Sequence, residues 1–134
     1  MSSFTRLARA YNTAKVIAFD DASKLILFSD CHRGDNSFAD DFSNNRNIYF
    51  HALKHYYNEG FSYIELGDGD ELWENTSFEP IFTAHKNIFG LLREYHLQNR
   101  LHMIWGNHDM VYRDPEYVKR NLSTYFDPKV GEDV

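Results

Sequence analysis

Asp30 and His32 stand two residues apart, directly after the apolar run 25–28. At the end of an extended strand, residues i and i+2 point to the same side, so a carboxylate and an imidazole would project together. That pair of ligands suits a divalent transition metal ion. The alternative is a strand-end aspartate that caps a turn beside a surface histidine.

An acidic, glycine-rich segment, Gly67-Asp68-Gly69-Asp70-Glu71, follows the second apolar run. Glycine on either side of Asp68 lets the backbone turn sharply and approach its neighbours closely. The two oxygens of the Asp68 carboxylate could then bridge two metal ions. Two alternatives stay open. One is a plain acidic turn, and the other is aspartyl-phosphate chemistry, because Asp68-Gly69-Asp70 resembles the Asp-x-Asp of dehalogenase-type phosphatases.

The third segment, Gly106-Asn107-His108-Asp109, is the most specific of the three. The amide oxygen of Asn107 is a neutral metal ligand. His108, held by Asp109, could donate a proton to a leaving oxygen or hydrogen-bond a developing phosphoryl charge. The alternative is an asparagine turn with a histidine that faces solvent.

Each polar segment follows a short apolar run, at residues 25–28, 63–66 and 101–105. Runs of this length that end in Gly, Asp or Asn predict buried strands. Strands that alternate with helices predict an α/β fold with a βαβαβ order and a parallel sheet. Because the carboxyl ends of parallel strands share one edge of the sheet, the three polar segments are expected to meet there.

Four helices are expected around these strands. A short one covers residues 4–11 and precedes an extended stretch at 16–19. Helical spacing of Ile48, Ala52, Leu53 and Tyr56 predicts the second, which ends near Gly60. Apolar residues over 81–95 predict the third. Asp114-Pro115-Glu116 predicts the start of the fourth, with a capping carboxylate and a proline in the first turn.

Composition narrows the class of protein. The 134 residues carry 14 basic and 20 acidic side chains, a formal net charge of −6, so no broad nucleic-acid-binding face is expected. Bound metal ions could reverse the sign of the charge locally for a phosphate substrate. One cysteine excludes an internal disulfide, and no apolar run is long enough for a signal peptide or a transmembrane segment. The expected location is the cytoplasm.

The three motifs together, in this order, resemble the calcineurin-like metallophosphoesterase superfamily, over residues 24–109. The longer form Gly67-Asp-x-x-Glu71-Leu-Trp73 is more similar to the UDP-diacylglucosamine hydrolase branch than to the protein phosphatases. The resemblance implies a dinuclear hydrolase in which a metal-bound hydroxide attacks a phosphomonoester, phosphodiester or pyrophosphate. It also implies a phosphorylated small-molecule or nucleotide-type substrate. Mn²⁺ is the expected metal, with Fe, Zn and Co as alternatives.

Site roles follow from the resemblance, position by position. Asp30 and His32 would hold the first metal ion, Asp68 would bridge both ions, and Asn107 would hold the second. His108 would face the substrate with Asp109 behind it, and Glu71 would lie behind the metal ligands. Arg33 is expected to contact a substrate phosphate, bidentately where the geometry allows; a solvated loop arginine is the alternative.

The chain departs from the family pattern after Asp109, because residues 110–134 contain none of the histidines that complete both metal shells. The family fold is a sandwich of two sheets flanked by helices, and the predicted strands fill one sheet. Residues 1–134 are therefore expected to be a single, incomplete domain that lacks the second sheet and the C-terminal part. A non-catalytic fragment or degenerate relative that binds a partner is the competing hypothesis. Self-association through the uncovered sheet is also expected.

Overall fold

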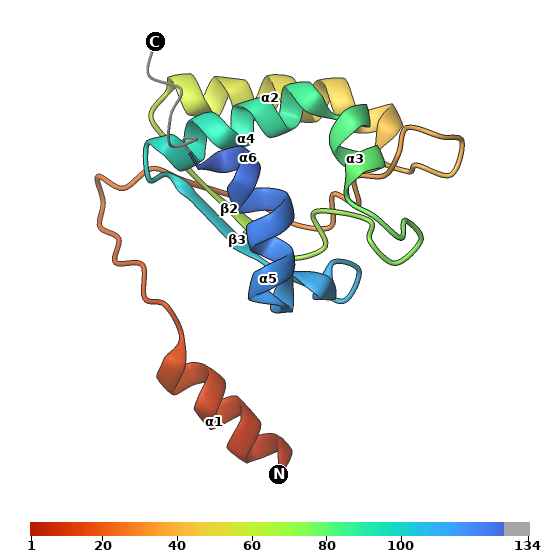
Figure 1. Ribbon diagram of the computed structural model, residues 1–134. Coiled ribbons are helices and arrows are strands. Elements are labelled where there is room, and N and C mark those ends of the chain that lie inside the picture. The colour runs from red at the N-terminus through yellow and green to blue at the C-terminus, as the bar shows by residue number, and fades with distance from the viewer. Residues whose placement is uncertain (128–134) are drawn as a thin grey trace.

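A computed structural model describes residues 1–127 as an α/β fold around a three-stranded parallel sheet (Figure 1). The strands are β1 (Leu25–Phe28), β2 (Ser62–Leu66) and β3 (Leu101–Ile104), with β2 in the centre. All pairing is parallel, so the expected βαβαβ order and parallel sheet are confirmed. Residues 128–134, which the expected single domain also includes, lie outside the described part.

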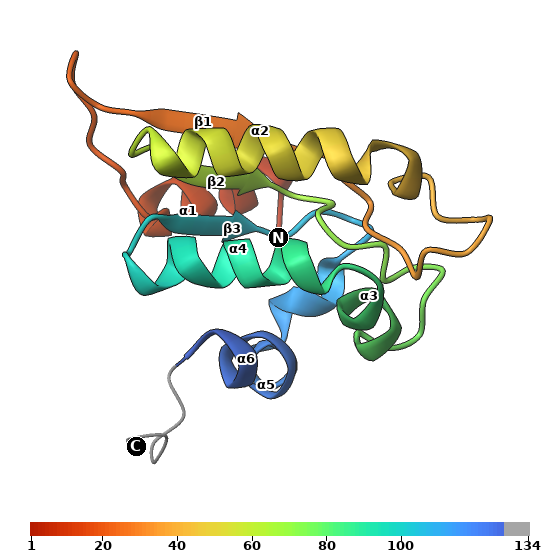
Figure 2. The same cartoon turned by 90° about the horizontal axis from the view of Figure 1, so that it is seen from above.

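Six α-helices and three short helical turns complete the described chain. The α-helices are α1 (Ser3–Thr13), α2 (Arg46–Asn58), α3 (Glu79–Ala84), α4 (Lys86–Leu97), α5 (Pro115–Val118) and α6 (Thr124–Phe126). The turns are η1 (Ser43–Asn45), η2 (Met110–Arg113) and η3 (Lys119–Ser123). Helices α2 and α4 lie side by side over one face of the sheet, and α1 stands apart on the opposite side (Figure 2). No helix in residues 1–127 is both long enough and apolar enough to cross a membrane.

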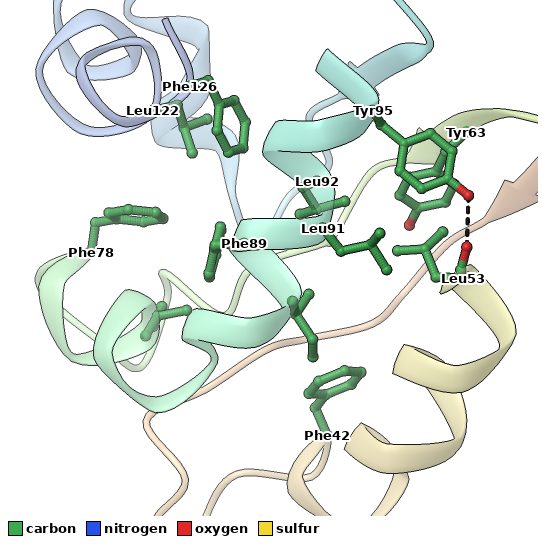
Figure 3. Close-up of a cluster of buried hydrophobic side chains, with 12 residues drawn as sticks. Phe42, Leu53, Tyr63, Phe78, Phe89, Leu91, Leu92, Tyr95, Leu122 and Phe126 are labelled. Carbon is green, nitrogen blue, oxygen red and sulfur yellow. Dashed lines mark hydrogen bonds between the residues drawn. The ribbon is translucent and has the colours of Figure 1, made fainter. Parts of the chain in front are cut away.

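The core lies between the sheet and the pair α2 and α4, and it continues around α4 to Phe78, Leu122 and Phe126 (Figure 3). Helix α4 contributes the most to it, because a whole side of this helix is apolar. Its buried residues are Ile88, Phe89, Leu91, Leu92 and Tyr95. The Tyr95 hydroxyl also donates a hydrogen bond of 2.7 Å to the carbonyl of Leu53, which joins α4 to α2.

The apolar stripe predicted for α2 is confirmed in part. Leu53 is fully buried as expected, but Ile48, expected on the same face, is 71% exposed. Tyr49 and Tyr57 pack against the core on either side of Leu53. The helix ends as expected beside Gly60, which has a φ of 85° that residues other than glycine rarely adopt.

The helix expected over residues 81–95 is two helices, α3 and α4, which separate at His85. His85 leaves the helical conformation, with φ −125° and ψ 37°. Its fully buried imidazole donates a hydrogen bond of 3.0 Å to the carboxylate of Asp40. Gly90, the weakest helix former of the stretch, lies inside α4 without a break.

The remaining helix predictions are confirmed in outline. Helix α1 covers the expected residues 4–11 and starts with Ser2 as a capping side chain. Helix α5 starts at Pro115, and the Asp114 carboxylate accepts the backbone N–H of Glu116 at 3.0 Å. The stretch 16–19, expected to be extended, belongs to no strand of the described sheet.

The sheet face opposite α2 and α4 is apolar and open. Leu27, Leu66 and Ile104 point to this face, and each exposes between 46% and 54% of its surface. This uncovered apolar face is the feature from which self-association is expected. The association itself stays a prediction.

Candidate functional site

The polar segments after β1 and β2 lie side by side at the carboxyl edge of the sheet, as expected. Hydrogen bonds continue the strand pairing into the loops: the N–H of Asp30 donates to the carbonyl of Gly67 at 3.1 Å. The N–H of His32 donates to the carbonyl of Asp68 at 2.9 Å. These bonds hold the first two predicted metal ligands against the predicted bridging ligand.

The third segment joins the same edge through Asp68. The backbone N–H of His108 donates to the Asp68 carboxylate at 2.8 Å, and the N–H of Leu72 donates to the carbonyl of His108 at 3.1 Å. Gly106 makes the approach possible, because a Cβ atom there would collide with Asp68. The structure thus brings all three motifs together.

The backbone is strained at three of the four predicted ligands. Asp30, His32 and Asp68 have φ values of 54°, 51° and 53°, in the left-handed region that side chains disfavour. Asp30 and His32 therefore do not sit on an extended strand end, and that part of the prediction is wrong. Left-handed residues other than glycine cluster at functional sites, and each stores about 1–3 kcal/mol of strain.

The side chains of Asp30, His32 and Asp68 nevertheless face one another. Each offers a ligand atom, and these atoms all lie within 4.8 Å of one another. The Nε2 atom of His32 is 3.7 Å from a carboxylate oxygen of Asp30. Two carboxylates and an imidazole are a donor set that Mn²⁺, Fe²⁺ or Zn²⁺ accepts.

Glu71 holds two histidines at once. Its carboxylate accepts a hydrogen bond from Nδ1 of His32 at 2.9 Å and another from Nδ1 of His108 at 2.8 Å. The two rings meet edge to face, with their centroids 4.5 Å apart. Both hydrogen bonds require a proton on Nδ1, so Nε2 of His32 stays free to bind a metal ion.

The same trio could itself be considered a metal site, because His32, Glu71 and His108 offer three ligand atoms in one cluster. The distances favour hydrogen bonds instead. Ligand atoms around a tetrahedral zinc ion, each about 2.0–2.1 Å from the metal, lie about 3.3 Å from one another. The nitrogen–oxygen distances here are 2.8 and 2.9 Å, which are ordinary for hydrogen bonds.

The hydrogen bonds that Glu71 shares with the two histidines shift the pKa of Glu71 and the pKa of His108. Burial acts to raise the pKa of the Glu71 carboxyl, but the hydrogen bonds from His108 and His32 outweigh burial and lower it. The hydrogen bond to Glu71 raises the pKa of His108 above its ordinary value. His108 is therefore better able to carry a proton near neutral pH than a free histidine.

Asp109 does not orient His108, and that prediction is wrong. Its buried carboxylate turns back into the loops, where it accepts the backbone N–H groups of Gly69 at 2.9 Å and Gly106 at 2.6 Å. Burial raises the pKa of Asp109, and these hydrogen bonds oppose the rise. Glu71 performs the orienting role that was expected of Asp109.

Arg33 is placed away from the groove surface, which does not favour the expected contact with a substrate phosphate, and the alternative of a solvated loop arginine is wrong. The side chain is fully buried, and its guanidinium forms ion pairs with Glu65 and Asp70. Each nitrogen of this buried guanidinium already donates to a protein oxygen, so the side chain is not aimed at the groove.

Asn107 is exposed at the tip of the third segment and stays a predicted ligand. Asp30, His32 and Asp68 fit one metal ion. For a second ion, Asp68 and Asn107 are the expected ligands that residues 1–127 supply. The expectation of two ions stays a prediction.

A groove of about 750 Å³ opens beside these residues. Asp30, His32, Glu71 and His108 form part of its wall. Apolar side chains, among them Leu27, Phe28, Ile48, Tyr49 and Ala52, line it as well, together with the polar Asp41, Asn45 and Glu74. The groove has room for a small phosphorylated molecule beside the histidine pair.

Two features of the site escape prediction from the sequence. The first is the double role of Glu71, for which the Gly-Asp-x-x-Glu spacing gave the sole signal. The second is Trp73, which is 68% exposed and whose ring lies edge-on to His108 at a centroid distance of 4.5 Å. Nothing in the run that contains Trp73 indicates which side chain it contacts.

Comparison with known proteins adds no relative: no family model, no curated protein and no solved structure matches this chain.

Proposed function

We propose that this protein is a metal-dependent phosphoester hydrolase. One observation carries the proposal: ligand atoms of Asp30, His32 and Asp68 converge within 4.8 Å of one another, and Asp30 and His32 line a groove together with His108. Metal ligands next to a proton-donating histidine are what hydrolysis of a phosphoester needs.

The donor set fits a divalent ion. Asp30 and Asp68 would bind through carboxylate oxygens, and His32 through Nε2, because Glu71 holds the proton on Nδ1. A divalent ion there supplies Lewis acidity, which makes water a better nucleophile and offsets the charge of the phosphoryl oxygens. Glu71 gives His32 the carboxylate partner that metal-binding histidines usually have.

His108 is the proton donor of the proposed reaction. In hydrolysis, an oxygen of water forms a bond to phosphorus and the bond from phosphorus to the leaving oxygen breaks. The leaving oxygen then needs a proton. Nε2 of His108 is the nitrogen that Glu71 leaves free, and the residue lines the groove. The raised pKa of His108 favours the protonated form that can donate.

The finer assignment rests on the motif resemblance. A calcineurin-like metallophosphoesterase would use two ions, Mn²⁺ first among them, and its fold would be half of a two-sheet sandwich. The three motifs, their order and their meeting at one sheet edge support this assignment. The open apolar face with Leu27, Leu66 and Ile104 is compatible with a second layer that covers the sheet.

The test is hydrolysis of 4-nitrophenyl phosphate and of bis(4-nitrophenyl) phosphate with and without Mn²⁺. We expect turnover that needs Mn²⁺, that is lost in Asp68→Ala, and that falls by about 10²- to 10⁴-fold in His108→Gln. His51→Gln is the matched control, since His51 is an exposed histidine of α2. No turnover of either ester, or equal rates for the wild type and Asp68→Ala, would refute the proposal.

A non-catalytic binding module is the second candidate. It is favoured by the small donor set, because Asp30, His32 and Asp68 suffice for one ion in residues 1–127. Equilibrium dialysis against Mn²⁺ separates the two. Two tightly bound ions per chain would contradict the binding-module reading, while one weakly bound ion and no turnover would support it.

A further inference from the structure

A buried arginine lies next to the candidate metal ligands but does not line the groove. Arg33 directly follows His32, and its side chain is fully buried. Burying a guanidinium is unfavourable unless every donor is paired. The positions of its partners in the fold indicate what Arg33 does.

The Arg33 guanidinium joins the central strand to the loop after it. On the strand, Nη1 and Nη2 bind both carboxylate oxygens of Glu65, at 2.7 and 2.8 Å. On the loop, Nε binds Asp70 at 2.8 Å. The planar fork of an arginine can make both contacts at once, whereas a lysine ammonium is a single point charge.

Neighbouring side chains complete the network on each side. The Tyr63 hydroxyl donates to Glu65 at 2.7 Å, on the strand side. The Tyr112 hydroxyl donates to the second oxygen of Asp70 at 2.6 Å, on the loop side. The guanidinium carbon also lies 5.4 Å from the centre of the Phe89 ring, so the network is anchored in the core.

The backbone of Arg33 repeats the connection. Its N–H donates to the carbonyl of Gly69 at 2.9 Å, and its carbonyl accepts the N–H of Glu71 at 2.9 Å. A Cβ atom on Gly69 would lie 2.7 Å from Nη2 of Arg33, so the loop packs directly on the ion pair. Backbone hydrogen bonds of Arg33 therefore hold the loop at Gly69 and at Glu71, on both sides of Asp70.

We propose that Arg33 is a positioning residue. It holds the loop that carries Asp68 and Glu71 against His32, and thereby sets the affinity of the site for a metal ion. The proposal rests on the proposed function in one respect, namely that Asp30, His32 and Asp68 are the ligands.

The strained backbone at Asp30, His32 and Asp68 needs surrounding contacts that hold it in place. The left-handed conformations of Asp30, His32 and Asp68 persist where the surroundings over-determine them. A buried ion pair contributes little net stability compared with apolar residues of the same volume. The ion pair instead fixes the positions of the strand and the loop, because its hydrogen bonds are directional and apolar contacts are not.

The test uses the whole chain and Arg33→Lys, which keeps the buried charge and loses the fork. We expect Arg33→Lys to stay folded by circular dichroism and to bind Mn²⁺ about 10- to 100-fold more weakly in calorimetric titration. Unchanged Mn²⁺ affinity in a folded Arg33→Lys would overturn the proposal.

Two tyrosine variants separate positioning from general stability. Tyr112→Phe removes a hydrogen bond on the loop side, and Tyr63→Phe removes one on the strand side. We expect Mn²⁺ affinity to fall about 3- to 10-fold in Tyr112→Phe and to stay unchanged in Tyr63→Phe. If Arg33→Lys does not fold, this pair decides: equal affinities in the two variants would contradict the positioning role.

A metal-free measurement tests the positioning of the loop separately from metal binding. In the apo protein, long-range ¹H–¹⁵N correlation spectra report which ring nitrogen of His32 and His108 carries the proton. We expect Nδ1–H on both in the wild type and a mixture of tautomers in Arg33→Lys. If the wild type binds no Mn²⁺, the proposed function fails. The effect of Arg33 on metal affinity then fails with it, but the tautomers still decide whether Arg33 positions the loop against His32, and identical tautomers in the two proteins would overturn that positioning role.

Discussion

The carboxyl edge of the sheet, with its loops and the end of β2, carries two sets of ionisable side chains, and the two sets are neutralised in different ways. The rim consists of Asp30, His32, Asp68 and His108, which line or border the groove. The floor consists of Arg33, Glu65, Asp70 and Asp109, which are buried. Residues of the rim and of the floor are close neighbours in the sequence, as His32 and Arg33 or His108 and Asp109 show.

Every charge of the floor is paired inside the protein. Arg33 binds two carboxylates, and Asp109 binds backbone N–H groups. The rim keeps lone pairs that no donor within residues 1–127 uses, such as the one on Nε2 of His32. The comparison teaches that closeness to a site does not make a polar residue part of its chemistry. What counts is whether its donors and acceptors are already satisfied.

The largest expected difference between floor and rim is in stability. Arg33→Met should lower the free energy of unfolding by about 3–5 kcal/mol, because Glu65 and Asp70 would stay buried without a partner. Asp30→Asn, on the rim, should change it by less than about 0.5 kcal/mol. Urea unfolding followed by tryptophan fluorescence measures both. Equal losses in the two variants would remove the distinction between floor and rim.

A smaller effect is expected where Glu71 connects the two histidines of the rim. Glu71→Gln should return the pKa of His108 towards its ordinary value, because the hydrogen bond to the carboxylate is what raises it. The same variant should weaken Mn²⁺ binding about 10- to 100-fold. Histidine titration by NMR gives the pKa, and calorimetry gives the affinity.

Glu74→Gln is the matched control for Glu71→Gln. Glu74 lines the same groove and carries the same charge, but the hydrogen bonds to His32 and His108 belong to Glu71. The pKa of His108 should therefore move less in Glu74→Gln. Equal shifts in the two variants would mean that charge alone, without the hydrogen bonds, controls His108.

The smallest effect is a difference in the pH dependence of stability between two histidines. Burial lowers the pKa of His85, against the opposing hydrogen bond to Asp40, so the unfolded chain takes up the proton first. His85 should then make the fold less stable as the pH falls below about 6.5. His108, whose pKa is raised, stabilises the fold below about 6.5 and loses that contribution as the pH rises through its higher folded-state value.

Unfolding free energies of His85→Gln and His108→Gln, measured against the wild type from pH 5 to pH 8, test this pair. Relative to the wild type, His85→Gln should gain stability at the acidic end. His108→Gln should lose stability there. Slopes that change in the same direction for both variants would contradict the assignment of one histidine to the buried interior and the other to the rim.

Strands and strand ends were predictable from the sequence because local features define them. The apolar runs that became β1, β2 and β3 end in glycine or small polar residues, and parallel pairing then brings their ends together. The convergence of Asp30, His32 and Asp68 follows from that topology. The left-handed backbone at these residues does not follow from it, because tertiary hydrogen bonds such as that from His32 to the carbonyl of Asp68 impose it.

Directions of side chains were harder to predict than positions in the chain. Ile48 fits a helical apolar stripe, but the helix turns Leu53 to the core and leaves Ile48 at the groove. Arg33 and Asp109 look like loop residues, and their burial depends on partners far away in the sequence. The exchange of roles between Asp109 and Glu71 has the same cause, since the turn after His108 sends the nearer carboxylate inward.

The ion pairs of Arg33 span 32 residues to Glu65 and 37 residues to Asp70, a stretch that contains the whole of α2. During folding, this loop of chain must close before the guanidinium finds its partners, and closure is opposed by the entropy of the loop. Until then, three charged groups stay in water, where they are well solvated. We therefore expect the loops after β1 and β2 to take their final conformation only after β1, α2 and β2 have come together.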